Sequence, residues 1–176
     1  VGTGVALNTL TVITTGSGTG NNGDVTLNNN INANNAFDFT QALEETVIPL
    51  AATVVLGNTL NNGGAIRIEG TLDVGANNTI RVGGNWDDNG TFEERNGTVI
   101  FNGTSTLLDN ETFYNLTIDA AGILDANGNV ITVTNTYDNQ GLLERLGTGG
   151  ESVPEDNNSG TVRYDNAGGP WNIQDY

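Results

Sequence analysis

Carboxylates are the chemically active groups that this chain offers in greatest number. It carries 21 Asp and Glu against five Lys and Arg, with no His and no Cys. Two nearby carboxylates can divide the roles of general acid and general base between them. Neighbouring residues on a strand point to opposite faces, however, so adjacent carboxylates do not converge by themselves. We therefore expect no enzyme from the four adjacent pairs, which are Glu44/Glu45, Asp87/Asp88, Glu93/Glu94 and Glu155/Asp156.

Calcium binding is the other chemistry that these carboxylates suggest. The segments DDNG (87–90), DANGN (125–129) and EDNN (155–158) place hard oxygen ligands on turns, which suits Ca²⁺. None has the spacing of an EF-hand loop or of a nonapeptide calcium roll. The interpretation as solvated turns therefore stays open beside the metal hypothesis. If Ca²⁺ binds, we predict the ligands Asp87, Asp88, Asp125 and Asn127, and we expect no other cofactor.

The sequence gives little support for nucleotide binding or for nucleophilic catalysis. The segment GTGNNG (18–23) matches the glycine spacing of a dinucleotide site, but the strand-like DVTLN follows it where a helix would be needed. Serine occurs at positions 17, 105, 152 and 159, all in turn-like contexts without a His or Cys to act as a base or nucleophile. We interpret both features as turn chemistry.

The net charge of −16 narrows the class of partner. A strongly acidic surface repels nucleic-acid phosphates and anionic lipids, so we expect neither as a partner. No apolar run reaches the length of a membrane helix, so membrane insertion is not expected either.

Short alternating segments dominate the chain and predict an all-β fold. Their β-branched residues alternate with polar ones, and Asn- and Gly-rich turns separate them. The stretch 39–50 reads instead as a loop or a short helix, because Pro49 and the run Thr46–Val47–Ile48 limit any helix there. The segments expected to be strands are 9–14, 24–28, 53–57, 65–70, 79–84, 98–103, 115–119, 130–134 and 161–165.

Internal repetition predicts the arrangement of these strands. Shifting residues 77–94 forward by 51 positions aligns Ile80 with Ile131 and Trp86 with Tyr137. With rungs of roughly 20–25 residues this offset is about two rungs, and the chain makes about seven or eight. We predict a right-handed parallel β-helix, with a β-sandwich as the alternative. Residues 1–176 would form a single β-solenoid domain with loop excursions near 35–50 and 146–159.

Two stretches carry a family resemblance. LTVITTGSGTGNNGDVTLNNNINAN (10–34) resembles the filamentous-haemagglutinin type of parallel β-helix. GGNWDDNGTF, GTVIFNGTST and FYNLTI (83–118) are similar to repeats of large bacterial cell-surface and secreted proteins. The resemblance implies a structural role outside the cell or at its surface, often in adhesion, and it implies no catalytic residue.

The two ends of the chain complement one another. The final repeat stops at Tyr176, which aligns with Tyr114, and lacks the NLTIDAAG that follows Tyr114. The opening LNTLTVITTG (7–16) resembles that missing continuation, with Leu10 standing where Leu116 stands. Unpaired rung edges must be capped or paired, which favours head-to-tail stacking. The residues expected at such an assembly interface are Leu7, Leu10, Val12, Trp171, Ile173 and Tyr176.

Three functions follow as hypotheses. The first is a structural subunit of an extracellular filament or surface layer, whose partners are copies of itself. The second is a segment of a large bacterial surface adhesin that binds cell-surface or matrix glycans or protein. The third is a polysaccharide-acting β-helix enzyme, which would need carboxylates from neighbouring rungs.

Overall fold

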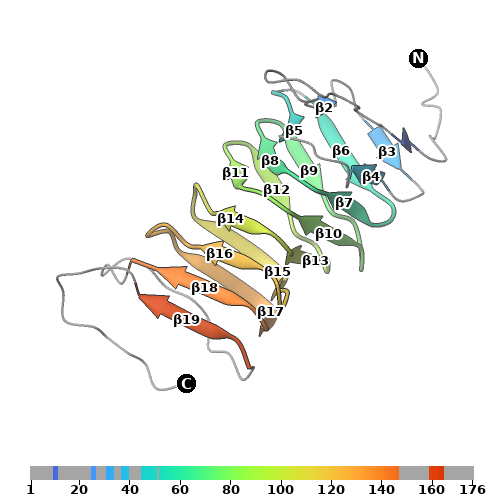
Figure 1. Cartoon of the computed structure of the whole chain (residues 1–176). Coiled ribbons are helices and arrows are strands. Elements are labelled where there is room, and N and C mark those ends of the chain that lie inside the picture. The colour runs from blue at the N-terminus through green and yellow to red at the C-terminus, as the bar shows by residue number, and fades with distance from the viewer. Residues whose placement is uncertain are drawn as a thin grey trace, which may run out of the picture.

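The computed structural model describes residues 10–11, 25–26, 31–33, 37–39, 45–50, 52–146 and 159–164. These residues form strands joined by short turns, and no helix occurs among them. The strands stack along one axis. The first strands, β1 to β4, lie at one end of the stack, and β19 lies at the other end (Figure 1). The predicted all-β class is confirmed for this part of the chain.

Four parallel sheets make up the stack. The main sheet, in spatial order, contains β1 (Leu10–Thr11), β4 (Phe37–Phe39), β7 (Leu60–Asn62), β10 (Thr79–Val82), β13 (Thr98–Phe101), β15 (Glu111–Ile118) and β17 (Ile131–Asn139). The second sheet contains β11 (Trp86–Asp88), β8 (Ala65–Ile68), β5 (Glu45–Ile48) and β2 (Val25–Thr26). The third sheet contains β12 (Thr91–Glu93), β9 (Thr71–Asp73), β6 (Thr53–Leu56) and β3 (Ile31–Ala33). The fourth sheet contains β14 (Thr104–Thr106), β16 (Ile123–Asp125), β18 (Leu142–Arg145) and β19 (Thr161–Tyr164).

Every pairing between described strands is parallel, which identifies a β-solenoid of about six turns. The β-sandwich alternative is wrong, because sandwiches are built from antiparallel sheets. Ile80 pairs with Leu60 one turn earlier, so a turn there takes 20 residues, as the sequence predicted. The seven or eight turns expected refer to the whole chain, and the turns of its described part number about six. The right-handed sense of winding stays a prediction.

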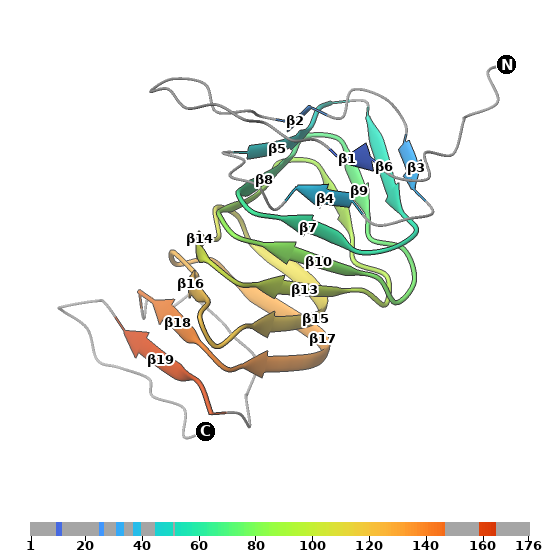
Figure 2. The ribbon, with the colours of Figure 1, turned by 45° about the vertical axis from the view of Figure 1, so that its right-hand side comes forward.

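The cross-section of the solenoid changes along its axis. The turns β4–β6, β7–β9 and β10–β12 each give one strand to the main, second and third sheets. The turns β13–β14, β15–β16 and β17–β18 each give one strand to the main sheet and one to the fourth sheet (Figure 2). The main-sheet strands lengthen at this transition, from four residues in β13 to eight in β15 and nine in β17. A three-faced solenoid therefore becomes two-faced partway along the chain.

This change explains why the 51-residue alignment is wrong as a stacking register. The residue of β17 in the column of Ile80 is Tyr137, which is reached through Val99 and Leu116. Ile131 instead pairs with Glu111, which has no counterpart in β10 or β13. Turns that contain three strands and turns that contain two differ in length, so no single residue offset relates stacked positions along the whole solenoid.

Alternation between inward and outward positions builds the core. In β8, for example, Ile66 and Ile68 are fully buried while Arg67 between them is partly exposed. Leu72, Leu124 and their column neighbours continue this packing from turn to turn. Burying one such Leu or Ile side chain contributes about 1.5–3 kcal/mol. A column of regularly spaced aliphatic residues thus stabilises each turn on the next.

The region predicted as a loop excursion at 35–50 contributes two strands to the stack. β4 pairs with β7, and β5 pairs with β8 in a continuous register. Thr46, Val47 and Ile48 are buried, so the helix considered for 39–50 is wrong over these positions. The β-branched side chains favour the strand. Residues 40–44 and 147–158 lie outside the described part, and the single-domain assignment stays a prediction.

Glycines hold one corner of the stack where successive turns touch. A Cβ atom on Gly103 would overlap the carbonyl oxygen of Gly83, and a Cβ on Gly83 would overlap that of Gly63. The three glycines follow one another at intervals of 20 residues, so they form a backbone column with no room for a side chain. Such close approach of backbones requires glycine.

Candidate functional site

An aromatic cluster fills the core where the cross-section changes. The ring of Trp86 meets Phe92 at 4.9 Å, Phe113 at 5.7 Å and Phe101 at 6.3 Å between centroids, all edge to face. Each such pair adds about 0.5–1.5 kcal/mol beyond the burial of its area. Trp86 also forms the last contact of the second sheet, a bridge to Leu107. Large aromatic rings therefore fill the core at the point where the second and third sheets end.

Glu111 lies against this cluster and is only 9% exposed. Its Oε2 accepts a hydrogen bond from Trp86 Nε1 at 2.7 Å, and its Oε1 accepts one from the Thr112 backbone N–H at 2.7 Å. Burial nevertheless dominates and raises the pKa of Glu111 to about 8. The side chain is therefore protonated in the folded protein at neutral pH.

Asp88 is the acidic neighbour of Glu111. The Asp88 carboxyl hydrogen-bonds with Glu111, and burial raises its pKa although the Gly90 N–H donates to Oδ1 at 3.0 Å. Two carboxyl groups in contact titrate as a pair. Asp87, on the opposite side of β11, also has a raised pKa, through burial and then through contact with Asp109. We call Asp87, Asp88, Asp109 and Glu111 the junction carboxyls.

Sequence reasoning selected Asp87 and Asp88 but missed Asp109 and Glu111. Only the register, with Leu107 stacked on Trp86, brings the segment 109–111 beside 87–88. The sequence carried a signal for Glu111. This residue begins a strand whose other buried positions, up to Ile118, are all apolar. An acidic residue at an inward position of a strand is unusual unless it is paired.

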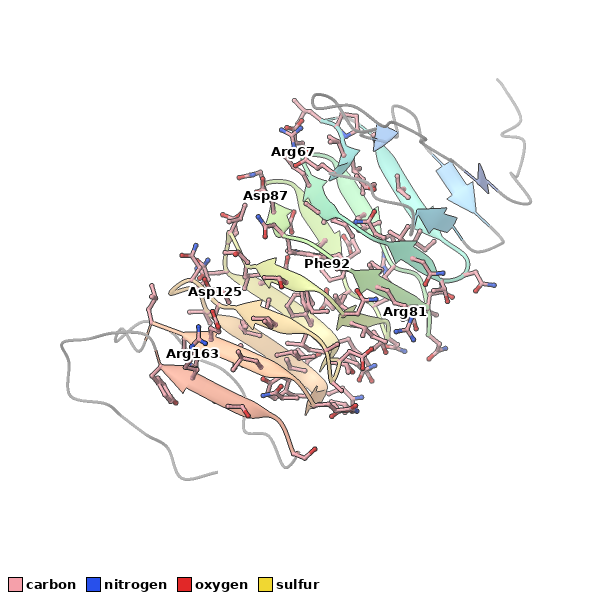
Figure 3. All side chains as sticks on the ribbon, in the orientation of Figure 1. Arg67, Arg81, Asp87, Phe92, Asp125 and Arg163 are labelled. Carbon is pink, nitrogen blue, oxygen red and sulfur yellow. The ribbon has the colours of Figure 1, made fainter. Side chains whose placement is uncertain are left out.

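The four predicted calcium ligands do not converge. Asp87 and Asp88 lie in β11 of the second sheet, whereas Asp125 lies in β16 of the fourth sheet (Figure 3). Asp125 Oδ1 accepts the Asn127 N–H at 2.8 Å and so closes its own turn, in which Asn127 has φ of 52°. Within the described residues no group of three or more acidic side chains has the geometry of a metal site. Binding of Ca²⁺ to Asp87 and Asp88, or to Asp125 and Asn127, stays a prediction.

Most residues of the predicted assembly interface lie outside the described part of the chain. These are Leu7, Val12, Trp171, Ile173 and Tyr176. Leu10 belongs to β1, where its backbone pairs with Phe37. The register also places Leu10 in the same column as Leu116, the residue with which the sequence comparison aligned it.

The described solenoid ends in two edge strands of different character. β17 closes the main sheet, and its segment 131–137 contains no charged residue while Thr132, Thr134 and Thr136 are exposed. β19 closes the fourth sheet and carries charge, because Arg163 forms an ion pair with Glu144 and the Arg145 guanidinium lies 5.4 Å from the Tyr164 ring centroid. Gly160 N donates to Asn139 O at the end of β17 at 2.8 Å, so the chain that leads into β19 contacts β17 there.

A shallow groove of about 380 Å³ follows the corner between the second and third sheets. Thr53, Thr71 and Thr91 occupy one column along it, on three successive turns. Leu50 at its rim is 80% exposed, the most exposed of the large apolar side chains described. The sequence shows this column only as Gly-Thr at 70–71 and again at 90–91. The groove is lined by Leu50, Ala52, Thr53, Glu69, Gly70, Thr71, Asn89, Gly90 and Thr91.

Among the described residues there is no helix that is long and apolar enough to span a membrane. A scan against family models and searches of curated proteins and solved structures found no match to this chain.

Proposed function

We propose that this chain is a structural subunit of an extracellular filament or surface layer that assembles head to tail by noncovalent stacking of solenoids. The observation that carries the proposal is the parallel main sheet, which continues from β1 to β17 and whose last described strand has no charged residue over 131–137. The resemblance of 10–34 to filamentous-haemagglutinin repeats supports the location outside the cell.

The physical reason is the unsatisfied hydrogen bonding of an edge strand. A row of unpaired N–H and C=O groups is a template for another strand of the same direction. All strands of the main sheet run in parallel, so a second copy continues the ladder when it stacks in the same orientation. A contact between two different surfaces of one subunit propagates as an open fibre.

The net charge of −16 makes this assembly sensitive to ions. Acidic subunits repel one another at low ionic strength, and salt screens that repulsion with a Debye length of about 8 Å at physiological strength. We therefore expect more assembly as salt rises, and more still where a divalent cation binds the carboxylates between subunits.

Electron microscopy of the purified, untagged chain tests the proposal. Samples at low and physiological ionic strength, with and without Ca²⁺, are to be compared with the mass measured by light scattering over a range of protein concentrations. Unbranched fibres of constant width are expected, with a constant mass per length of one chain for each stacked solenoid. A monomer at every concentration and in every buffer would refute head-to-tail assembly.

A segment of a surface adhesin is the second candidate, and the corner groove favours it. Thr71 and Thr91, on successive turns of the groove that Leu50 borders, offer hydroxyl groups beside an apolar contact to a neutral glycan or a peptide. Binding to an array of neutral glycans that is lost in Thr71→Val and kept in Thr79→Val, a main-sheet threonine, would support this candidate. Equal binding by both variants would count against it.

A further inference from the structure

Six asparagines of the chain stand directly before a glycine. In such a pair the backbone nitrogen of the glycine can attack the side-chain amide carbon of the asparagine, because glycine has no Cβ to crowd the approach. Asparagine is for this reason among the thermolabile residues of proteins. Five of the six pairs lie in the described part of the chain, where they begin at Asn62, Asn89, Asn96, Asn102 and Asn127.

Hydrogen bonds of the side chain restrain two of these pairs. Asn62 is only 2% exposed, and its amide accepts from the Thr46 hydroxyl at 2.6 Å and donates to the Gly64 carbonyl at 2.8 Å. Asn89 Nδ2 donates at 2.5 Å to the carboxyl group two residues before it. The attacking N–H of Gly90 likewise donates at 3.0 Å to the carboxyl group two residues before it. Either reaction must first break these bonds.

The backbone of the turn restrains two further pairs, although both asparagines are exposed. The attacking nitrogen after Asn96 is occupied, because Gly97 N donates to Glu94 O at 2.9 Å. Asn127 has φ of 52°, which is the left-handed conformation. In that conformation ψ is about +47°, so Cβ points almost directly away from the following nitrogen. The cyclic intermediate of the reaction needs Cβ and that nitrogen on the same side, so the turn must open before Asn127 reacts.

Asn102 has none of these restraints. Its side chain is exposed, and within the described residues neither its amide group nor the Gly103 N–H has a hydrogen-bond partner. Its φ is not in the left-handed region. One backbone bond, from Asn102 N to Val82 O at 3.0 Å, holds the residue in the stack and involves neither reacting group. The electrophile and the nucleophile are therefore both available at this pair.

We propose that Asn102 is a site of spontaneous deamidation in the folded solenoid, and that it reacts fastest among the described Asn–Gly pairs. The Gly103 nitrogen attacks Asn102 Cγ, the Cγ–Nδ2 bond breaks, and the amide group leaves as ammonia with the proton of the Gly103 N–H. Water then adds to one of the two carbonyls of the cyclic imide and opens the ring. The product is aspartate or isoaspartate with one new carboxylate. Water is the only co-reactant, and the inference does not depend on filament assembly.

The place of this pair in the fold gives the reaction a structural consequence. Isoaspartate carries the main chain through Cβ, so the corner between β13 and β14 gains one methylene group. Gly103 belongs to the glycine column, where the backbone of Gly83 leaves no room even for a Cβ atom. On the other side the Ile123 N–H donates to the Gly103 carbonyl at 2.8 Å. The lengthened corner must shift against both neighbouring turns, so the isoaspartate product is less stable than the fresh protein.

Peptide mapping of the whole chain during storage at mildly alkaline pH tests the site. Mass spectrometry, with fragmentation that separates isoaspartate from aspartate, gives the rate at each asparagine in the folded protein and in concentrated urea. Dividing the folded rate by the urea rate removes the local effect of sequence. We expect this ratio to be about tenfold higher or more at Asn102 than at the other four positions. An equal ratio at Asn62, or a higher one at Asn96 or Asn127, would overturn the proposal.

Matched variants test the consequence for stability. Asn102→Gln removes the site, because glutamine would have to close a larger ring, and Asn96→Gln removes an exposed pair that should react slowly. After storage the urea midpoint should fall in the wild type and in Asn96→Gln, and it should stay unchanged in Asn102→Gln. Fresh Asn102→Asp carries the new charge without the added methylene and should keep the wild-type midpoint. An unchanged midpoint in stored wild type that contains isoaspartate at this position, or an equal fall in fresh Asn102→Asp, would refute the role of the glycine column.

Discussion

The buried carboxyl of Glu111 makes the stability of the solenoid depend on pH in a direction that the structure determines. Its pKa is raised from 4.5 to about 8 by burial against the aromatic cluster. In the unfolded chain the group ionises near its ordinary pKa, so between these two values the folded state holds a proton that the unfolded state has lost. The stabilisation is therefore complete below pH 4.5 and is lost as the pH rises through about 8.

The size of the effect follows from the width of this pH window. Each unit of pKa difference corresponds to about 1.4 kcal/mol, so the free energy of unfolding should fall by on the order of 4 kcal/mol between pH 4.5 and pH 8. The raised pKa values of Asp87 and Asp88 act in the same direction, whereas the lowered pKa of Asp73 beside Arg95 opposes them at acid pH. Comparison with a variant is needed to isolate Glu111.

Urea denaturation of the wild type and Glu111→Gln at half-unit steps from pH 4 to pH 9 measures that contribution. Glutamine is neutral at every pH, but its NH2 group replaces one of the two oxygens that accept the Trp86 and Thr112 N–H groups, so one of these donors loses its acceptor. We expect the variant to be less stable than the wild type by about 1 kcal/mol at pH 4 and more stable by a few kcal/mol at pH 8.5. The two stability curves should cross.

Glu94→Gln, with the same change of charge at a partly exposed position, controls for the overall loss of one negative charge. Its curve should run nearly parallel to that of the wild type. Parallel curves for Glu111→Gln as well would show that Glu111 ionises normally in the folded protein, and the reasoning from burial would be refuted.

Three further substitutions test the packing of the stack, each read from the urea midpoint. Gly103→Ala should destabilise the protein by about 1–3 kcal/mol, since its Cβ overlaps the backbone of Gly83, and an unchanged midpoint would show that the glycine column can spread. Asn62→Ala should lower the free energy of unfolding by about 3 kcal/mol, because the Thr46 hydroxyl and the carbonyls of Gly64 and Ala65 lose their buried partner. A decrease below about 1 kcal/mol would mean that water replaces the amide. Arg95→Ala, which breaks exposed ion pairs, should move the midpoint far less than Asn62→Ala, and an equal shift would contradict that ranking.

Much of the fold can be predicted from the pattern of residues along the chain. Segments such as 65–68 and 79–82 alternate inward aliphatic with outward polar residues, and that period allows only strands. Repeated Asn and Gly turns at intervals near 20 residues favour stacking of like on like, which the parallel register confirms. The prediction of a loop or short helix was wrong over 45–48, because Pro49 and the β-branched run before it were used only to limit a helix and the preference of that run for a strand was not followed.

The stacking partners could not be predicted in the same way. Whether Trp86 lies under Leu107, and whether Glu111 therefore reaches Asp88, depends on the number of residues in each turn of the main chain between them. The length of a turn changes where three faces become two, and no local pattern in the sequence marks that point. The offset of 51 residues inferred from the sequence is therefore wrong as a stacking register.

The sequence by itself determined that the chain forms short strands, that these stack, and that the net charge is −16, because hydrophobic period, turn residues and charge are local properties of the residues. Only the tertiary structure decided which residues share a column, that the cross-section changes, that Glu111 is buried beside Asp88, and that one sheet continues from β1 to β17. These features arise from contacts between residues about 20 positions apart or more, whose register depends on how every preceding turn packs.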